Sequence, residues 1–107
     1  MSLDFYLLDD TSTEYYWCNI THNLGRMAAH AGIYDCLWHP EDYNIFRASQ
    51  IIEPLEKGLA AMKAFPEIYR KYDAPNKWGT YDDFVPWLEE LLDNCRMYPD
   101  AQITASR

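Results

Sequence analysis

The segment Cys18–Asn23 holds the densest group of side chains that could bind a ligand or carry out chemistry. Its sequence is Cys-Asn-Ile-Thr-His-Asn, and it lies where the hydrophobic pattern changes from strand-like to helix-like. Asn and Thr at such a junction are typical helix caps, because their side-chain oxygens accept hydrogen bonds from unpaired backbone N–H groups. The sequence therefore favours a capping role for this segment.

The alternative for the same segment is a small ligand-binding pocket formed by four polar side chains, Asn19, Thr21, His22 and Asn23. Backbone N–H groups at the start of a helix, together with the His22 imidazole, would face an anionic or amide-bearing ligand. Gly25 would allow the ligand to approach the backbone closely. Trp17 and Trp38 would supply apolar walls, although large aromatic residues usually belong to the core.

Cysteine and histidine also recur at spacings that could bind a metal ion. Cys18 and His22 are four residues apart, and Cys36 and His39 are three apart, so each pair would share one face of a helix. Structural zinc takes four such ligands. However, Cys18 is expected in an extended segment, and cysteine is often buried simply as a small hydrophobic residue. The sequence therefore disfavours a metal site at these residues and predicts no cofactor.

A catalytic thiol is a weaker hypothesis still. Cys18 beside His22 could be activated, because a neighbouring imidazole lowers the pKa of a thiol. No glycine-rich turn that could stabilise an oxyanion accompanies the pair, and no serine elbow, P-loop or dinucleotide-binding motif occurs in the chain. We therefore predict no catalytic residue, and the sequence favours a protein that is not an enzyme.

The third candidate site is an acidic face on the predicted C-terminal helix, formed by Asp82, Asp83, Glu89, Glu90 and Asp93. This face could bind a basic surface on another protein through charge complementarity. The alternative, which the sequence favours for this helix alone, is an ordinary solvated helix face. The formal net charge of −8 supports a protein partner with a basic surface and disfavours direct binding of nucleic acid or anionic membranes.

The length of 107 residues predicts a single domain spanning 1–107. Three cysteines without a CxxC pair, no N-terminal signal pattern and no long apolar run predict a cytoplasmic protein with reduced thiols and no membrane span.

The hydrophobic pattern predicts an α+β fold. Leu3–Leu8 and Glu14–Ile20 are expected to form an N-terminal hairpin, and 101–105 is expected to pair with Leu3–Leu8 in a small antiparallel sheet. Apolar residues at helical spacing predict two to three amphipathic helices, at about 21–31, 51–62 and 84–95. Gly32 and Thr80 are expected as helix caps, and Pro54 and Pro86 predict irregular helix starts. The alternative fold is a small all-α bundle with extended ends.

Several short segments resemble a loose group of uncharacterised phage and bacterial proteins. These segments are Asp4–Asp9, Asn19–Asn23, Pro54–Glu56, and Leu91–Leu92 continuing to Tyr98–Ala101. The resemblance implies a microbial or viral cytosolic protein that contacts another protein, and it implies no catalytic residues.

Together these observations predict a small acidic protein that acts as a non-catalytic protein-interaction module, either an inhibitor or an adaptor. The alternative is a small-ligand or metal-binding module centred on Asn19–Asn23.

Overall fold

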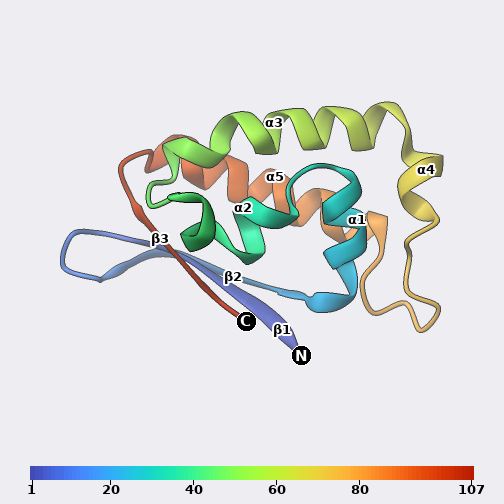
Figure 1. Ribbon diagram of the computed structural model, residues 1–107, viewed down its shortest axis with the longest axis horizontal. Coiled ribbons are helices and arrows are strands. Elements are labelled where there is room, and N and C mark those ends of the chain that lie inside the picture. Colours follow the sequence, from blue (N-terminus) through green and yellow to red (C-terminus); the bar gives the residue numbers. More distant parts are fainter.

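The computed structural model describes all 107 residues and has an α+β fold (Figure 1). Three antiparallel strands form the sheet, β1 (Ser2–Leu8), β2 (Glu14–Thr21) and β3 (Gln102–Ser106), in the order β2-β1-β3. The helices cover one face of this sheet, and the two chain ends lie close together (Figure 1). The predicted hairpin and the pairing of the C-terminal strand with the N-terminal one are confirmed, and the all-α alternative is wrong.

The central strand β1 shows why this sheet forms. Leu3, Phe5 and Leu7 alternate with polar or half-exposed residues, and all three are fully buried against the helices. Phe5 pairs with Cys18 on β2 and with Ala105 on β3, so the inner faces of all three strands join one core.

The two long helices pack against each other and supply most of the rest of the core. Helix α3 (Ser49–Ala64) and helix α5 (Tyr81–Met97) bury the apolar stripes that the sequence predicts, Ile51, Leu55, Leu59 and Met62 on α3 and Phe84, Leu88, Leu91 and Cys95 on α5. The hydroxyl of Thr80 caps α5 by accepting a hydrogen bond from the backbone N–H of Asp83. Both helices begin with hydrogen bonds of the tighter three-residue spacing and continue through Pro54 and Pro86.

The segment between the hairpin and α3 consists of short turns rather than one helix. It forms η1 (His22–Leu24), α1 (Gly25–His30), α2 (Tyr34–Trp38) and η2 (Pro40–Tyr43). Gly32, with a φ of +78°, ends α1: its N–H donates to Ala29 and the N–H of Ile33 donates to Ala28, the pair of bonds that defines a Schellman cap. The predicted helix at 21–31 is therefore shorter than expected, but its predicted glycine cap is confirmed.

A further short helix, α4 (Pro66–Arg70), and a long loop connect α3 to α5. No helix of the protein is both long enough and apolar enough to cross a membrane.

Candidate functional site

The polar side chains of Cys18–Asn23 point to several different places. Thr21 is the helix cap that the sequence predicts, since its hydroxyl accepts a hydrogen bond of 3.2 Å from the N–H of Asn23. Asn19 lies on the exposed sheet face and donates to Asp4 at 2.8 Å. The Asn23 amide donates to the carbonyl of Trp78 at 2.8 Å and ties the junction to the loop before α5. Helix capping therefore explains Thr21, and hydrogen bonds to residues distant in the sequence explain the two asparagines.

His22 turns the other way, toward the buried Trp38 of α2. The Trp38 indole N–H donates to Nδ1 of His22 at 2.9 Å. Since Nδ1 accepts this bond, the neutral imidazole carries its proton on Nε2 and presents it as a donor. On its other side the indole stacks on Tyr34, with ring centroids 5.2 Å apart and planes 13° from parallel. Trp38 therefore orients the His22 imidazole through a hydrogen bond and the Tyr34 ring through stacking.

These three rings lie in a surface pocket of about 570 Å³, a size typical of small-ligand sites. The pocket is lined by His22, Gly25, Arg26, Ala29, Tyr34, Trp38, His39 and Arg107. None of these eight residues is acidic, and four carry an imidazole or a guanidinium group. On a chain with a net charge of −8, this pocket is a local concentration of basic side chains.

The two arginines of the pocket differ in their surroundings. Arg107 follows β3 and donates to the carbonyl of Trp38 at 2.6 Å and to the Glu41 carboxylate at 2.8 Å. This ion pair raises the pKa of Arg107 and lowers the pKa of Glu41. Arg26 is exposed, forms no ion pair, and also lines a neighbouring hollow that contains Lys71. Arg26 is therefore the cation that is free to bind an anionic ligand.

The predicted pocket is only partly the observed one. His22, Gly25 and Trp38 line it, as the pocket hypothesis requires. Trp17 does not, because it lies on the exposed face of the sheet, where its indole donates to Asp4 at 3.1 Å. The N–H of Gly25 is bonded to the His22 carbonyl, so side chains rather than helix N–H groups supply the pocket's donors. Sequence reasoning did not identify Arg26, Tyr34 or Arg107.

The four residues considered as metal ligands do not come together. The sulfur of Cys18 faces the carbonyl of Phe5 in the core, that of Cys36 bonds the carbonyl of Ile33, and Nδ1 of His22 is bonded to Trp38. His39 belongs to a different cluster, with Glu41 and Asp42.

The thiols also lack the environment of a nucleophile. Burial raises the pKa of Cys18, Cys36 and Cys95 from 9.0 to about 12 in each case. Reactive cysteines have the opposite shift, so this arrangement disfavours the Cys18–His22 dyad.

The predicted acidic face lies on α5, and all five of its residues are exposed. Much of its charge is locally compensated. Arg70 forms a two-pronged pair with Asp82, Lys63 pairs with Glu89 at 2.7 Å, and Arg96 lies 3.7 Å from Asp93. Asp83 and Glu90 form no ion pair and remain available for a partner.

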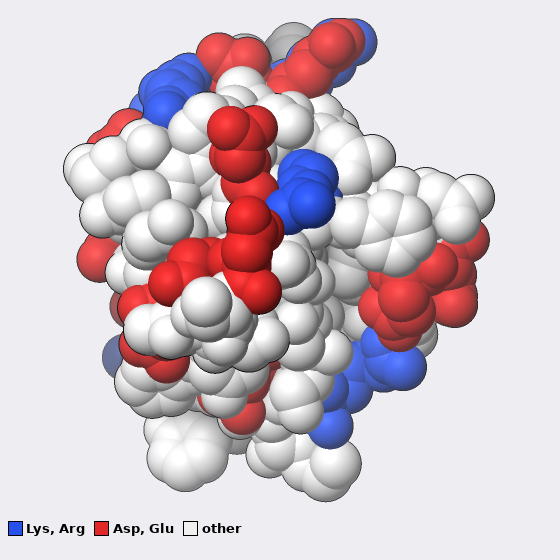
Figure 2. Space-filling model, turned by 90° about the vertical axis from the view of Figure 1, so that its left-hand side faces the viewer, with Lys and Arg blue, Asp and Glu red and all other residues white.

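A second acidic region lies at the end of the molecule that carries the β1–β2 turn. Acidic side chains gather in the middle of this end, with a basic group beside them (Figure 2). Asp9, Asp10 and Asp100 line a hollow of about 450 Å³ there, together with Arg47 and Tyr15. The exposed Tyr15 ring stacks on the half-buried Tyr98 with centroids 4.4 Å apart, so an aromatic pair lies beside the carboxylates.

Comparisons with protein-family models, curated protein sequences and solved structures returned no match.

Proposed function

We propose that the protein binds a small anionic ligand with a planar part in the pocket between η1–α1 and α2. The observation that carries this proposal is the meeting of two imidazoles and two guanidiniums beside the stacked Tyr34–Trp38 pair, on a chain that is otherwise acidic. A pocket of this size with a few convergent polar groups is the usual form of a small-ligand site.

Each lining residue has a separate role in this proposal. Arg26 supplies an unpaired guanidinium that forms charge-assisted hydrogen bonds with a phosphate or carboxylate. His22 donates from Nε2 because Trp38 occupies its Nδ1. The ring of Tyr34, backed by the buried Trp38 on which it stacks, provides a flat apolar wall for the planar part of the ligand. In this proposal the protein binds its ligand without catalysis, since no activated nucleophile accompanies these groups. We place it in the cytoplasm, because three buried cysteines without disulfide bonds fit a reducing compartment.

The test is a titration with phenyl phosphate, benzoate and phenol, followed by the indole N–H resonance of Trp38 in NMR spectra. We expect the two anions to shift this resonance and phenol to do so only weakly. Arg26→Gln should weaken anion binding by about tenfold or more, which corresponds to the loss of one charge-assisted hydrogen bond. Lys57→Gln on α3 is the matched control, because Lys57 is exposed and paired only with Glu53.

Two results would contradict the pocket proposal. One is the absence of any shift at Trp38 with either anion at millimolar concentration. The other is equal loss of binding in Arg26→Gln and Lys57→Gln, which would point to a general charge effect rather than a site.

A second candidate function is the protein-interaction module that the sequence favours, an inhibitor or adaptor that binds a basic protein surface. The unpaired Asp83 and Glu90 on α5 support it, as do the exposed carboxylates at the hairpin end (Figure 2). The resemblance to phage and bacterial proteins is compatible with this role and stays a prediction.

Its test is capture of a discrete partner from a microbial lysate, with binding that weakens as salt increases. The double variant Asp83→Asn/Glu90→Gln should lose the partner, whereas Glu67→Gln on α4 should retain it. Recovery of no discrete partner across a range of salt concentrations would contradict this role.

A further inference from the structure

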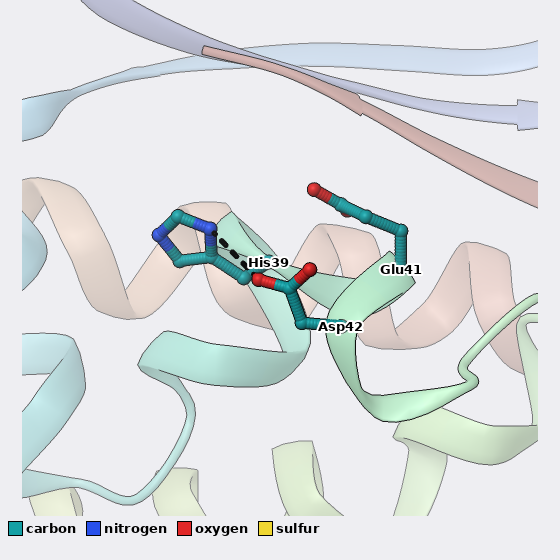
Figure 3. A group of neighbouring side chains, drawn as sticks. All are labelled: His39, Glu41 and Asp42. Atoms are coloured by element: carbon teal, nitrogen blue, oxygen red, sulfur yellow. Dashed lines mark ion pairs between the residues drawn. The ribbon is translucent and has the colours of Figure 1, made fainter.

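A separate group of potential metal ligands lies beside the pocket, at the start of η2 (Figure 3). His39, Glu41 and Asp42 each offer one ligand atom, and these three atoms lie within 4.8 Å of one another. Nδ1 of His39 is 3.7 Å from a carboxylate oxygen of Asp42. No other group of three His, Cys, Asp or Glu side chains in the protein is this close.

The backbone holds these side chains in place because the segment is tightly folded. Pro40 is buried and starts the turn, the N–H of Asp42 donates to the carbonyl of His39, and the N–H of Ile45 donates to the carbonyl of Pro40. Asn44, with a φ of +57°, ends the turn in the left-handed conformation. Local hydrogen bonds therefore fix the backbone that carries the three side chains.

Tyr34 contacts the His39 ring on the side opposite the carboxylates. Its hydroxyl lies 3.4 Å from Nε2 of His39, the ring nitrogen that faces away from Asp42. Metal-binding histidines almost always have their second ring nitrogen held in this way, which fixes the orientation of the ring and leaves the other nitrogen free to coordinate. In the tautomer that carries its proton on Nε2, this nitrogen donates to the Tyr34 oxygen, and the lone pair of Nδ1 is available to a cation held by the carboxylates.

Arg107 limits but does not block the cluster. It bonds one oxygen of Glu41 at 2.8 Å, and no other side chain donates a hydrogen bond to that carboxylate. Its other bond, to the carbonyl of Trp38, is a second anchor for the guanidinium that does not involve Glu41. The carboxylates of Glu41 and Asp42 and the single guanidinium of Arg107 together give the cluster a net negative charge.

We propose that His39, Glu41 and Asp42 bind a divalent transition-metal cation such as Zn²⁺ or Mn²⁺. One imidazole nitrogen with two carboxylate oxygens suits these ions better than Ca²⁺, which prefers oxygen ligands alone. Three protein ligands leave coordination positions open, and His39 also lines the pocket, so the cation is placed to hold the anionic group of a pocket ligand. This site goes beyond the proposed function and does not depend on it.

The test is calorimetric titration of the full chain with MnCl₂ and with ZnCl₂, with Mn²⁺ as the deciding ion because it binds thiolates poorly. We expect one ion per chain. His39→Asn and Asp42→Asn should each weaken binding by roughly 100-fold, and Tyr34→Phe by about tenfold through loss of the orienting bond. Thermal melts of each variant verify that it is folded.

The matched control is His30→Asn. His30 is exposed, whereas His39 is half-buried, and it likewise lies beside a tyrosine hydroxyl, with Nδ1 3.1 Å from Tyr72, but it has no carboxylate cluster. This variant should bind Mn²⁺ like the parent protein. Absence of Mn²⁺ and Zn²⁺ binding up to millimolar concentration would overturn the proposal, as would binding that His39→Asn leaves unchanged. Phenyl phosphate binding in the presence of EDTA separates the two proposals, because it tests the pocket without the metal.

Discussion

Alkylation of Cys18 tests directly whether the strand–helix junction can carry out nucleophilic chemistry. Cys18 is 8% exposed, and burial raises its pKa from 9.0 to about 12. At pH 8 this shift lowers the thiolate fraction about 1,000-fold, from roughly one in ten in the unfolded chain to about one in ten thousand. Because the thiolate is the reactive form, iodoacetamide should modify native Cys18 at least about 1,000 times more slowly than the unfolded chain.

The assay is mass spectrometry of the Cys18 peptide after timed exposure to iodoacetamide, in buffer and in guanidinium chloride. Cys36 and Cys95 are internal controls, since burial raises the pKa of each to about 12. All three should react slowly, at rates set by opening of the core. Native Cys18 reacting within about tenfold of its unfolded rate, with Cys36 and Cys95 still protected, would refute this reasoning and restore the catalytic-thiol hypothesis.

The remaining predictions concern stability. Gly79→Ala should destabilise the protein by about 3 kcal/mol in chemical denaturation, because Gly79 has a φ of +106° and a Cβ would lie 2.9 Å from the methyl group of Thr21. Gly32→Ala, at a φ of +78° but with no atom within 4 Å of the new Cβ, should cost only about 1–2 kcal/mol, and equal losses would contradict this reasoning. Burial raises the pKa of the three thiols, so their contribution to the free energy of unfolding is complete below pH 9.0 and is lost between pH 9.0 and about 12, by about 1.4 kcal/mol per thiol per pH unit. A series of thermal melts at increasing pH measures this loss, and a melting temperature that stays constant over this range would contradict it. Arg70 lowers the pKa of Asp82, so this ion pair stabilises the fold above the ordinary carboxyl pKa of 3.8, and the stabilisation is lost as the pH falls. Asp82→Asn should therefore make the fall of melting temperature at acid pH less steep, and an unchanged slope would argue against the pair.

The sequence was sufficient to predict the sheet because its signals are local and its strands have few alternatives. The alternation of Leu3, Phe5 and Leu7 fixes which face of β1 is buried, and the polar turn before Glu14 fixes the hairpin. It was not sufficient for the segment after Thr21, whose apolar spacing fits a continuous helix. Isolated helices of this length are marginal, so tertiary contacts such as the hydrogen bond from Asn23 to the Trp78 carbonyl decide where the turns fall.

The candidate pocket was only partly predictable for a related reason. His22, Gly25 and Trp38 are near one another in the chain, and their residue types alone indicate a polar pocket with an aromatic wall. Arg107 is 69 positions from Trp38, and it reaches the pocket only because β3 pairs with β1 in one particular register. Nothing in the spacing of the arginines indicates that two of them lie beside two imidazoles.

The distribution of ion pairs explains how an acidic protein can select a small anion. Six of its nine basic side chains pair with carboxylates, and the three that do not are Arg26, Lys71 and Lys77. Arg26 lines the pocket, and it shares a neighbouring hollow with Lys71. A long polyanion would meet the repulsion of the net charge of −8 over much of its length. A small anion is screened from carboxylates more than about 8 Å away in physiological salt, so it responds mainly to the groups at the pocket itself. Among these, Arg107 and His39 lie beside Glu41 and Asp42, and Arg26 is the unpaired cation. The same charge that disfavours nucleic acid therefore leaves room for a small phosphate or carboxylate ligand at this pocket.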